Sequence, residues 1–97
     1  MIERHVTFNV LPGKEKGFEA LFKEDYSVAM SRQPGFVSVT LLREHGKEAV
    51  YQMAIRFESI ETAAAWRDSS DHKALSPRIK TFYSESTVQV YEVIAQK

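Results

Sequence analysis

Residues 36–58, FVSVTLLREHGKEAVYQMAIRFE, decide the fold of this chain because they predict two strands joined by a short turn. Residues 36–43 and 48–58 are rich in β-branched and aromatic side chains, which are typical of strands. The polar segment 44–47 separates them, and its Gly46 can adopt the positive φ that a hairpin turn requires. The middle of the sequence therefore predicts an antiparallel hairpin.

A strand and a helix are predicted before this hairpin. Residues 2–11 alternate between apolar and polar side chains, which is the period of a β-strand. Over residues 14–30 the apolar side chains recur at helical spacing, with charged side chains on the opposite side. The segment QPG at residues 33–35 ends this helix, because proline disfavours a helical residue before it and glycine permits a sharp reversal.

A helix and a strand are predicted after the hairpin. Ser59 is a favourable N-cap for a second helix, and Glu61 lies in its first turn, where the helix dipole favours a carboxylate. One or two short helical turns are expected over residues 71–83, with Pro77 at a helical start. Residues 86–95 predict the last strand.

The order of these elements is β-α-β-β-α-β, which is the ferredoxin-like arrangement of an α+β fold. We expect a four-stranded antiparallel sheet with both helices on one face, in a single domain over residues 1–97. One register of the sheet is almost wholly apolar and is expected to face the helices: Val6, Phe8, Val10, Val37, Val39, Leu41, Tyr51, Met53, Ile55, Phe57, Val88 and Val90. The opposite register mixes polar side chains, His5 among them, with Phe36, Leu42, Val50, Ala54, Tyr91 and Val93.

This half-polar second face predicts an interface, because a large exposed apolar patch usually marks a surface that another molecule covers. Two copies of the face could cover each other in a homodimer, since a twofold axis places the same patch on both subunits. The alternative is a solvated sheet face with ordinary scattered hydrophobic residues.

The composition excludes several classes of function. Thirteen basic residues balance thirteen acidic ones, so no basic field exists to attract nucleic acid or an anionic membrane. The chain has no cysteine, which excludes disulfides, thiolate metal sites and a cysteine nucleophile, and its histidines show no metal-ligand spacing. The first residues, MIERHVTFNVLPGKEKG, lack the apolar segment of a signal peptide, and no run approaches the ~20 apolar residues of a membrane span, so a cytoplasmic location is expected.

Three residues are candidates for chemistry, each with a structural alternative. Asp25 falls inside the apolar arc of the first helix, where a carboxylate needs a partner or a polar cavity; the alternative is a helix-edge residue paired with a cation such as Arg32. Trp66 follows three alanines and can form the roof of a pocket, or else be a core residue. His72 lies in a polar turn, where it can transfer protons near neutral pH or simply be solvated.

Five segments at these spacings resemble the antibiotic biosynthesis monooxygenase family of the dimeric α+β barrel superfamily. They are VLPGKEKGFEALF at 10–22, SRQPGFVSVTLLR at 31–43, YQMAIRFESIETAAAW at 51–66, SSDHKALSP at 69–77 and VYEVI at 90–94. The most specific features are the QPGF turn and the order FESxExxxxW followed by a histidine. The resemblance implies a homodimer whose two sheets close into a barrel, with a pocket in each subunit between helices and sheet.

The resemblance also implies a cofactor-independent monooxygenase acting on a small aromatic, polyketide or quinol-like substrate. In such oxygenases the pocket promotes deprotonation of a phenolic substrate, which then passes an electron to O₂. It implies pocket walls formed by Trp66, Phe57, Phe22 and Val6, with His72 and Asp25 handling protons, and no metal ion.

Two alternatives remain open beside it. The haem-degrading branch of the family is similar at Trp66, but it has an asparagine where Val6 stands, and its ligand histidine corresponds to Ser76. Haem is therefore disfavoured, unless a shifted helix presents His72, which lies four residues earlier. The other alternative is a non-catalytic dimeric module that binds a small ligand in the same pocket.

Overall fold

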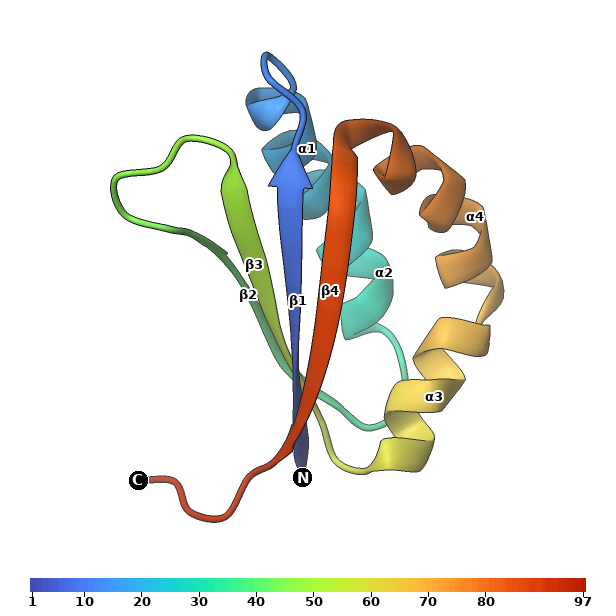
Figure 1. Cartoon of the computed structure of the whole chain (residues 1–97). Coiled ribbons are helices and arrows are strands. Elements are labelled where there is room, and N and C mark those ends of the chain that lie inside the picture. The colour runs from blue at the N-terminus through green and yellow to red at the C-terminus, as the bar shows by residue number, and fades with distance from the viewer.

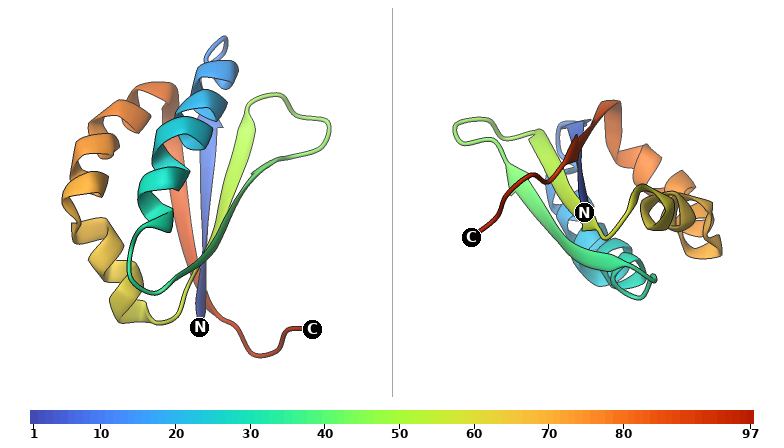
Figure 2. Two further views of the ribbon diagram at one scale, coloured as in Figure 1. Left: turned by 180° about the vertical axis from the view of Figure 1, so that it is seen from behind. Right: turned by 90° about the horizontal axis from the view of Figure 1, so that it is seen from below.

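The computed structural model describes residues 1–97 and has the expected ferredoxin-like α+β fold. Four antiparallel strands form one sheet in the order β2-β3-β1-β4, and the helices cover one of its faces (Figures 1 and 2). The strands are β1 (Ile2–Val10), β2 (Phe36–Arg43), β3 (Val50–Phe57) and β4 (Tyr83–Glu92). The first helical segment consists of α1 (Glu15–Leu21), the π-helix η1 (Phe22–Tyr26) and α2 (Ser27–Ser31). The second consists of α3 (Ile60–Asp68), α4 (Ser70–Ile79) and the short 3₁₀ helix η2 (Lys80–Phe82).

Strand β1 lies in the centre of the sheet because it pairs with both β3 and β4. Its helix-facing residues alternate with those that face away, as the sequence predicts, and Phe8 packs within the core. The adjacent strand β3 alternates without interruption, with every second side chain buried from Tyr51 to Phe57. The two central strands therefore supply most of the floor on which the helices pack.

The start of β2 differs from the expected register. Phe36 pairs with Phe57, whereas Ser38 pairs with Arg56, so Val37 is an extra residue in a β-bulge. As a result, the Phe36 ring lies on the helix side, 5.9 Å from that of Phe57, and Val37 is 40% exposed. The expectation that Val37 faces the helices and Phe36 faces away is wrong, because a bulge shifts the alternation by one residue.

The first helical segment is not a continuous α-helix. Its buried side chains Phe18, Phe22, Tyr26 and Met30 recur every fourth residue, which overshoots an α-helical turn by about 40° each time. The π-helix η1 absorbs this surplus, and the Ser27 N–H donates to the carbonyl of Phe22, five residues back. The π-turn keeps one face of the segment against the sheet.

The π-turn also corrects the expected position of Asp25. Tyr26 is buried in place of Asp25, whose side chain is 43% exposed and pairs with Arg78 at 2.8 Å. Asp25 therefore does not lie in the apolar arc, and its partner comes from α4 rather than from Arg32. A helical projection at 100° per residue fails here because it assumes a constant turn.

The second helical segment is longer and more regular than the expected short turns. Ser59 caps α3 as predicted, with its hydroxyl accepting from the Thr62 N–H at 3.1 Å. Ser69 caps α4 in the same way and accepts from the His72 N–H at 3.1 Å. Pro77 lies inside α4 rather than at its start, and β4 begins three residues before the predicted Ser86.

Candidate functional site

Helices α3 and α4 form an arc beside the sheet (Figure 1). A cavity of about 270 Å³ is lined by residues of this arc and of the sheet. Strands β1, β3 and β4 form its floor, and side chains of η1, α3 and α4 form its walls. Its lining consists of Arg4, Val6, Phe8, Tyr26, Met53, Ile55, Trp66, Arg67, His72, Ser76, Ile79, Lys80, Tyr83, Ser86 and Val88. The floor is largely apolar, and six of the fifteen lining residues are polar or charged, so the cavity can hold an apolar molecule that carries polar substituents.

Three rings from three different elements meet in the wall of this cavity. The Trp66 ring centroid is 5.5 Å from that of Tyr26 and 5.1 Å from that of His72, with interplanar angles of 87° and 85°. Edge-to-face contacts of this kind hold rings in defined orientations. Trp66 is almost fully buried, and no residue of the chain accepts a hydrogen bond from its indole N–H, although no fully enclosed polar atom lacks a partner. That N–H therefore has no hydrogen-bond partner within the chain.

His72 is half-buried beside cationic groups, and both conditions favour its neutral form. Burial lowers the pKa of His72 most, followed by the positive charges of Arg4, Arg67 and Lys80, against a smaller opposite effect of Asp68. Its imidazole is therefore uncharged at neutral pH and can accept a proton. Burial raises the pKa of Tyr26 to about 12, so its phenol stays protonated and can donate a hydrogen bond.

The structure brings together only some of the residues that the sequence singles out. Trp66, His72 and Val6 line the cavity, and so does Ser76. Phe57 is instead a core residue, 1% exposed. The remaining two candidates lie at other depressions of the surface: Phe22 at one beside Tyr51 and Leu41, and Asp25 at one beside Arg78 and Phe82.

Sequence reasoning missed Arg4 in the cavity and also the role of Tyr26. Arg4 lies on β1 at a helix-facing position, opposite Ile55 of β3, and is only 9% exposed. A signal was present, since Arg4 is the one charged residue in a register that otherwise consists of Ile2, Val6, Phe8 and Val10. Tyr26 could not be found in this way, because its burial depends on the π-turn.

The other depressions and the rest of the chain offer less to a ligand. The largest depression, about 920 Å³, lies at the β2–β3 hairpin and has no hydrophobic residue in its lining. No group of three or more His, Asp and Glu side chains is placed to hold a metal ion. None of the helices has the length and apolar character that a membrane crossing requires.

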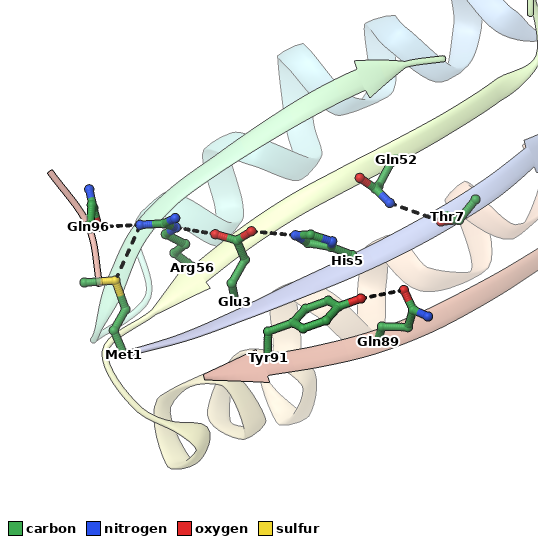
Figure 3. Close-up of polar contacts among 9 residues, drawn as sticks. All are labelled: Met1, Glu3, His5, Thr7, Gln52, Arg56, Gln89, Tyr91 and Gln96. Atoms are coloured by element: carbon green, nitrogen blue, oxygen red, sulfur yellow. Dashed lines mark hydrogen bonds and ion pairs between the residues drawn. The ribbon is translucent and has the colours of Figure 1, made fainter. Parts of the chain in front are cut away.

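The sheet face opposite the helices carries a polar network (Figure 3). Glu3 lies between His5, at 2.5 Å, and Arg56, which donates to it through Nε. Arg56 also donates to the Gln96 side chain at 2.5 Å, and the Tyr91 ring packs 4.8 Å from that of His5. His5 thus lies on the second face, as its register predicts.

The sequence model of the antibiotic biosynthesis monooxygenase family matches residues 1–78. The chain belongs to this family. No curated protein sequence matches the chain.

Solved structures with the same fold include SnoaB, a cofactor-independent oxygenase from Streptomyces nogalater, with a TM-score of 0.88 and 21% identity over 98% of this chain and 94% of that one. A conserved protein from Methanosarcina mazei Go1 has a TM-score of 0.83 and 16% identity, over 93% and 89% of the two chains. A mutant of MhuD with two manganese protoporphyrin IX bound per active site has a TM-score of 0.84 and 22% identity, over 100% and 98%. At these identities the likeness establishes the fold.

Proposed function

We propose that this family member is a cofactor-independent monooxygenase that acts on a small aromatic, polyketide or quinol-like substrate in the cavity beneath Trp66. One observation carries the proposal: a neutral His72 imidazole packs against Trp66 in the wall of a cavity with a largely apolar floor. The apolar floor can bind an aromatic ring, and the imidazole can accept a proton from a substituent of that ring. SnoaB, which shares the fold, is a cofactor-independent oxygenase.

The substrate itself supplies the electrons in this reaction. For an anthrone, His72 accepts a proton from the activated methylene group, and the resulting anion passes an electron to O₂. One oxygen atom becomes the new carbonyl oxygen, and the other leaves as water with the two hydrogens of the methylene group. In this proposal the protein binds the ring on the apolar floor, and His72 in the cavity wall accepts the proton.

Haem fits this cavity less well than a small aromatic molecule does. A volume of about 270 Å³ lies just below the range of about 300–1000 Å³ that is usual for ligand pockets, and a haem macrocycle is large for it. Ser76 lines the cavity at the position of the ligand histidine of haem-degrading relatives, and a serine hydroxyl is a poor iron ligand. We therefore expect the protein to leave the Soret band of free hemin unshifted.

We also propose that the protein is a homodimer formed through the second face of the sheet. That face holds the Glu3, His5 and Arg56 network together with exposed Leu42 and Tyr91, which are 45% and 44% exposed. Exposed large apolar and aromatic side chains gathered on one face are characteristic of a surface that a partner covers.

Oxygen uptake with an anthrone and a naphthoquinol tests the catalytic proposal. We expect His72→Gln to lower kcat by about 100-fold or more, because general bases contribute at least that much. Trp66→Phe keeps an aromatic ring but removes the indole N–H, so we expect a higher KM with the fold retained. His45→Gln, at an exposed position in the hairpin, is the matched control and should leave uptake unchanged.

Two results would contradict the proposal in different ways. Unchanged uptake in both the His72 and the Trp66 variants would remove these residues from the site. No uptake with any substrate, together with a raised melting temperature on adding naphthoquinol, would favour the non-catalytic binding module.

A further inference from the structure

The charge of the cavity goes beyond what the proposed oxygenation needs. Its lining includes three permanent cations, Arg4, Arg67 and Lys80, and no aspartate or glutamate. The whole chain has equal numbers of basic and acidic residues, so this is a local separation of charge rather than a general excess. Arg67 and Lys80 are exposed at the rim, whereas Arg4 lies on the floor.

Arg4 has no partner within the chain. The four ion pairs of the molecule do not involve it, and no side-chain hydrogen bond does either. Burial lowers the pKa of Arg4 most, followed by the positive charge of Arg67; Tyr26 has a smaller opposite effect, and no carboxylate contributes. The one cation–π contact is that of Lys14 with Phe82, so no aromatic ring compensates Arg4.

Arg4 differs in this respect from two other arginines of the molecule. Arg56 is paired with Glu3 and Arg78 with Asp25, although both arginines are more exposed than Arg4 and need a counter-ion less. An arginine that is nine-tenths buried without a carboxylate costs folding free energy. Since no fully enclosed polar atom lacks a partner, the Arg4 nitrogens must reach accessible space, and Arg4 lines this cavity.

We propose that the cavity binds its ligand as an aromatic carboxylate, with the carboxylate paired to Arg4 on the floor. A guanidinium and a carboxylate match in geometry and form two parallel hydrogen bonds. The aromatic ring then lies along the apolar floor, towards Trp66 and His72. Arg67 and Lys80 at the rim attract the anion to the entrance.

This inference rests on the proposed function for the identity of the site but is tested by binding alone. Calorimetry compares hydroxynaphthoate with naphthol, which has the same ring system and no carboxylate. We expect hydroxynaphthoate to bind at least about tenfold more tightly, because a charge-assisted hydrogen bond to a buried partner contributes that much. Acetate supplies a carboxylate without a ring and should bind much more weakly than either.

Variants at Arg4 separate a binding role from a structural one. Arg4→Met should abolish the preference for hydroxynaphthoate while naphthol binding changes little, and Arg4→Lys should keep part of the preference. Arg4→Met should also keep or raise the melting temperature, because it removes an unpaired buried charge. The matched control Arg32→Met, at an exposed position, should change neither binding nor stability.

Equal affinity for hydroxynaphthoate and naphthol would overturn the inference, as would a preference that survives in Arg4→Met. Acetate binding as tight as that of hydroxynaphthoate would also overturn it, since the site would then be a general anion site. The two proposals can fail separately. Oxygen uptake can be absent although the carboxylate is preferred, and uptake can be present although it is not.

Discussion

At the scale of single residues, the site depends on how tertiary neighbours alter ordinary side chains. Trp66 follows three alanines, of which Ala63 is the most buried, at 3% exposed. Small side chains let α3 approach the sheet, so the tryptophan can reach over the cavity from the same helix. His72 gains its neutral state from burial and from Arg4, which is distant from it in the sequence.

The lowered pKa of His72 predicts how stability depends on pH. The unfolded state takes up the proton near pH 6.5 and the folded state only at lower pH, so the free energy of unfolding falls as the pH drops below 6.5. We expect His72→Gln to flatten this dependence between pH 6.5 and 4.5, as measured by urea denaturation. Glu3, whose pKa is lowered from 4.5, contributes stability that is lost only below this window.

The control for this prediction is His45→Gln, which should keep the pH dependence of the natural chain. An identical pH dependence in His72→Gln and in the natural chain would contradict the lowered pKa. A direct titration of the His72 ring protons by NMR gives the folded-state value independently.

At the scale of elements, two local insertions shape the molecule. The bulge at Val37 turns Phe36 towards the helices, and the π-turn at residues 22–26 turns Tyr26 towards the cavity. Each adds one residue to an otherwise regular element and so changes which side chains of that element face the sheet or the helices. The Phe36 ring then packs on Phe57, and the Tyr26 ring packs on Trp66.

Gly35 lies in the turn between α2 and β2, where it packs against Thr62 of α3. We expect this position to tolerate no larger residue. Its φ is +78°, and a Cβ there would lie 2.5 Å from Thr62, the residue that completes the cap of α3. We expect Gly35→Ala to destabilise the protein by at least about 2 kcal/mol, from the left-handed backbone and the collision together. Urea denaturation measures this loss.

Gly13 is the matched control for that substitution, because its φ is +84° and a Cβ there would have no neighbouring atom within 4 Å. Gly13→Ala should therefore cost only the backbone term, about 1 kcal/mol. Equal losses in the two variants would mean that the close approach of Thr62 does not contribute.

At the scale of the whole molecule, the two sheet faces have different roles. The helix side holds the core and the cavity, while the second face holds a charge network and exposed hydrophobic side chains (Figure 3). In the proposed homodimer each subunit keeps its own cavity, and the interface gives the small core a second layer to pack against. A chain of this length buries a limited part of its surface alone, so such support is valuable.

Leu42→Glu tests the homodimer. It places a carboxylate on the edge strand β2, within the proposed interface, and twofold symmetry introduces it twice, so we expect the dimer Kd to rise by at least about tenfold. Light scattering at micromolar concentration measures the change. Ile60→Glu, at a side chain 53% exposed at the start of α3, is the control and should leave the dimer intact.

A monomeric natural chain at micromolar concentration would contradict the homodimer. A dimer that Leu42→Glu leaves unchanged would move the interface away from the second face.

Local patterns along the chain were enough to predict the order of elements, the antiparallel hairpin, the cap at Ser59 and the family. These follow from side-chain periodicity, from glycine and proline, and from the spacing of short segments, all of which are local properties of the chain. It also identified Trp66, His72 and Val6, which lie in one cavity. The folded structure was needed to see that Asp25 faces outwards, that Phe22 and Phe57 lie outside the cavity, and that Arg4 lies unpaired on its floor. These outcomes depend on where a π-turn falls, on the register of a sheet and on which side chains come close in three dimensions, and local spacing in the sequence does not fix any of the three.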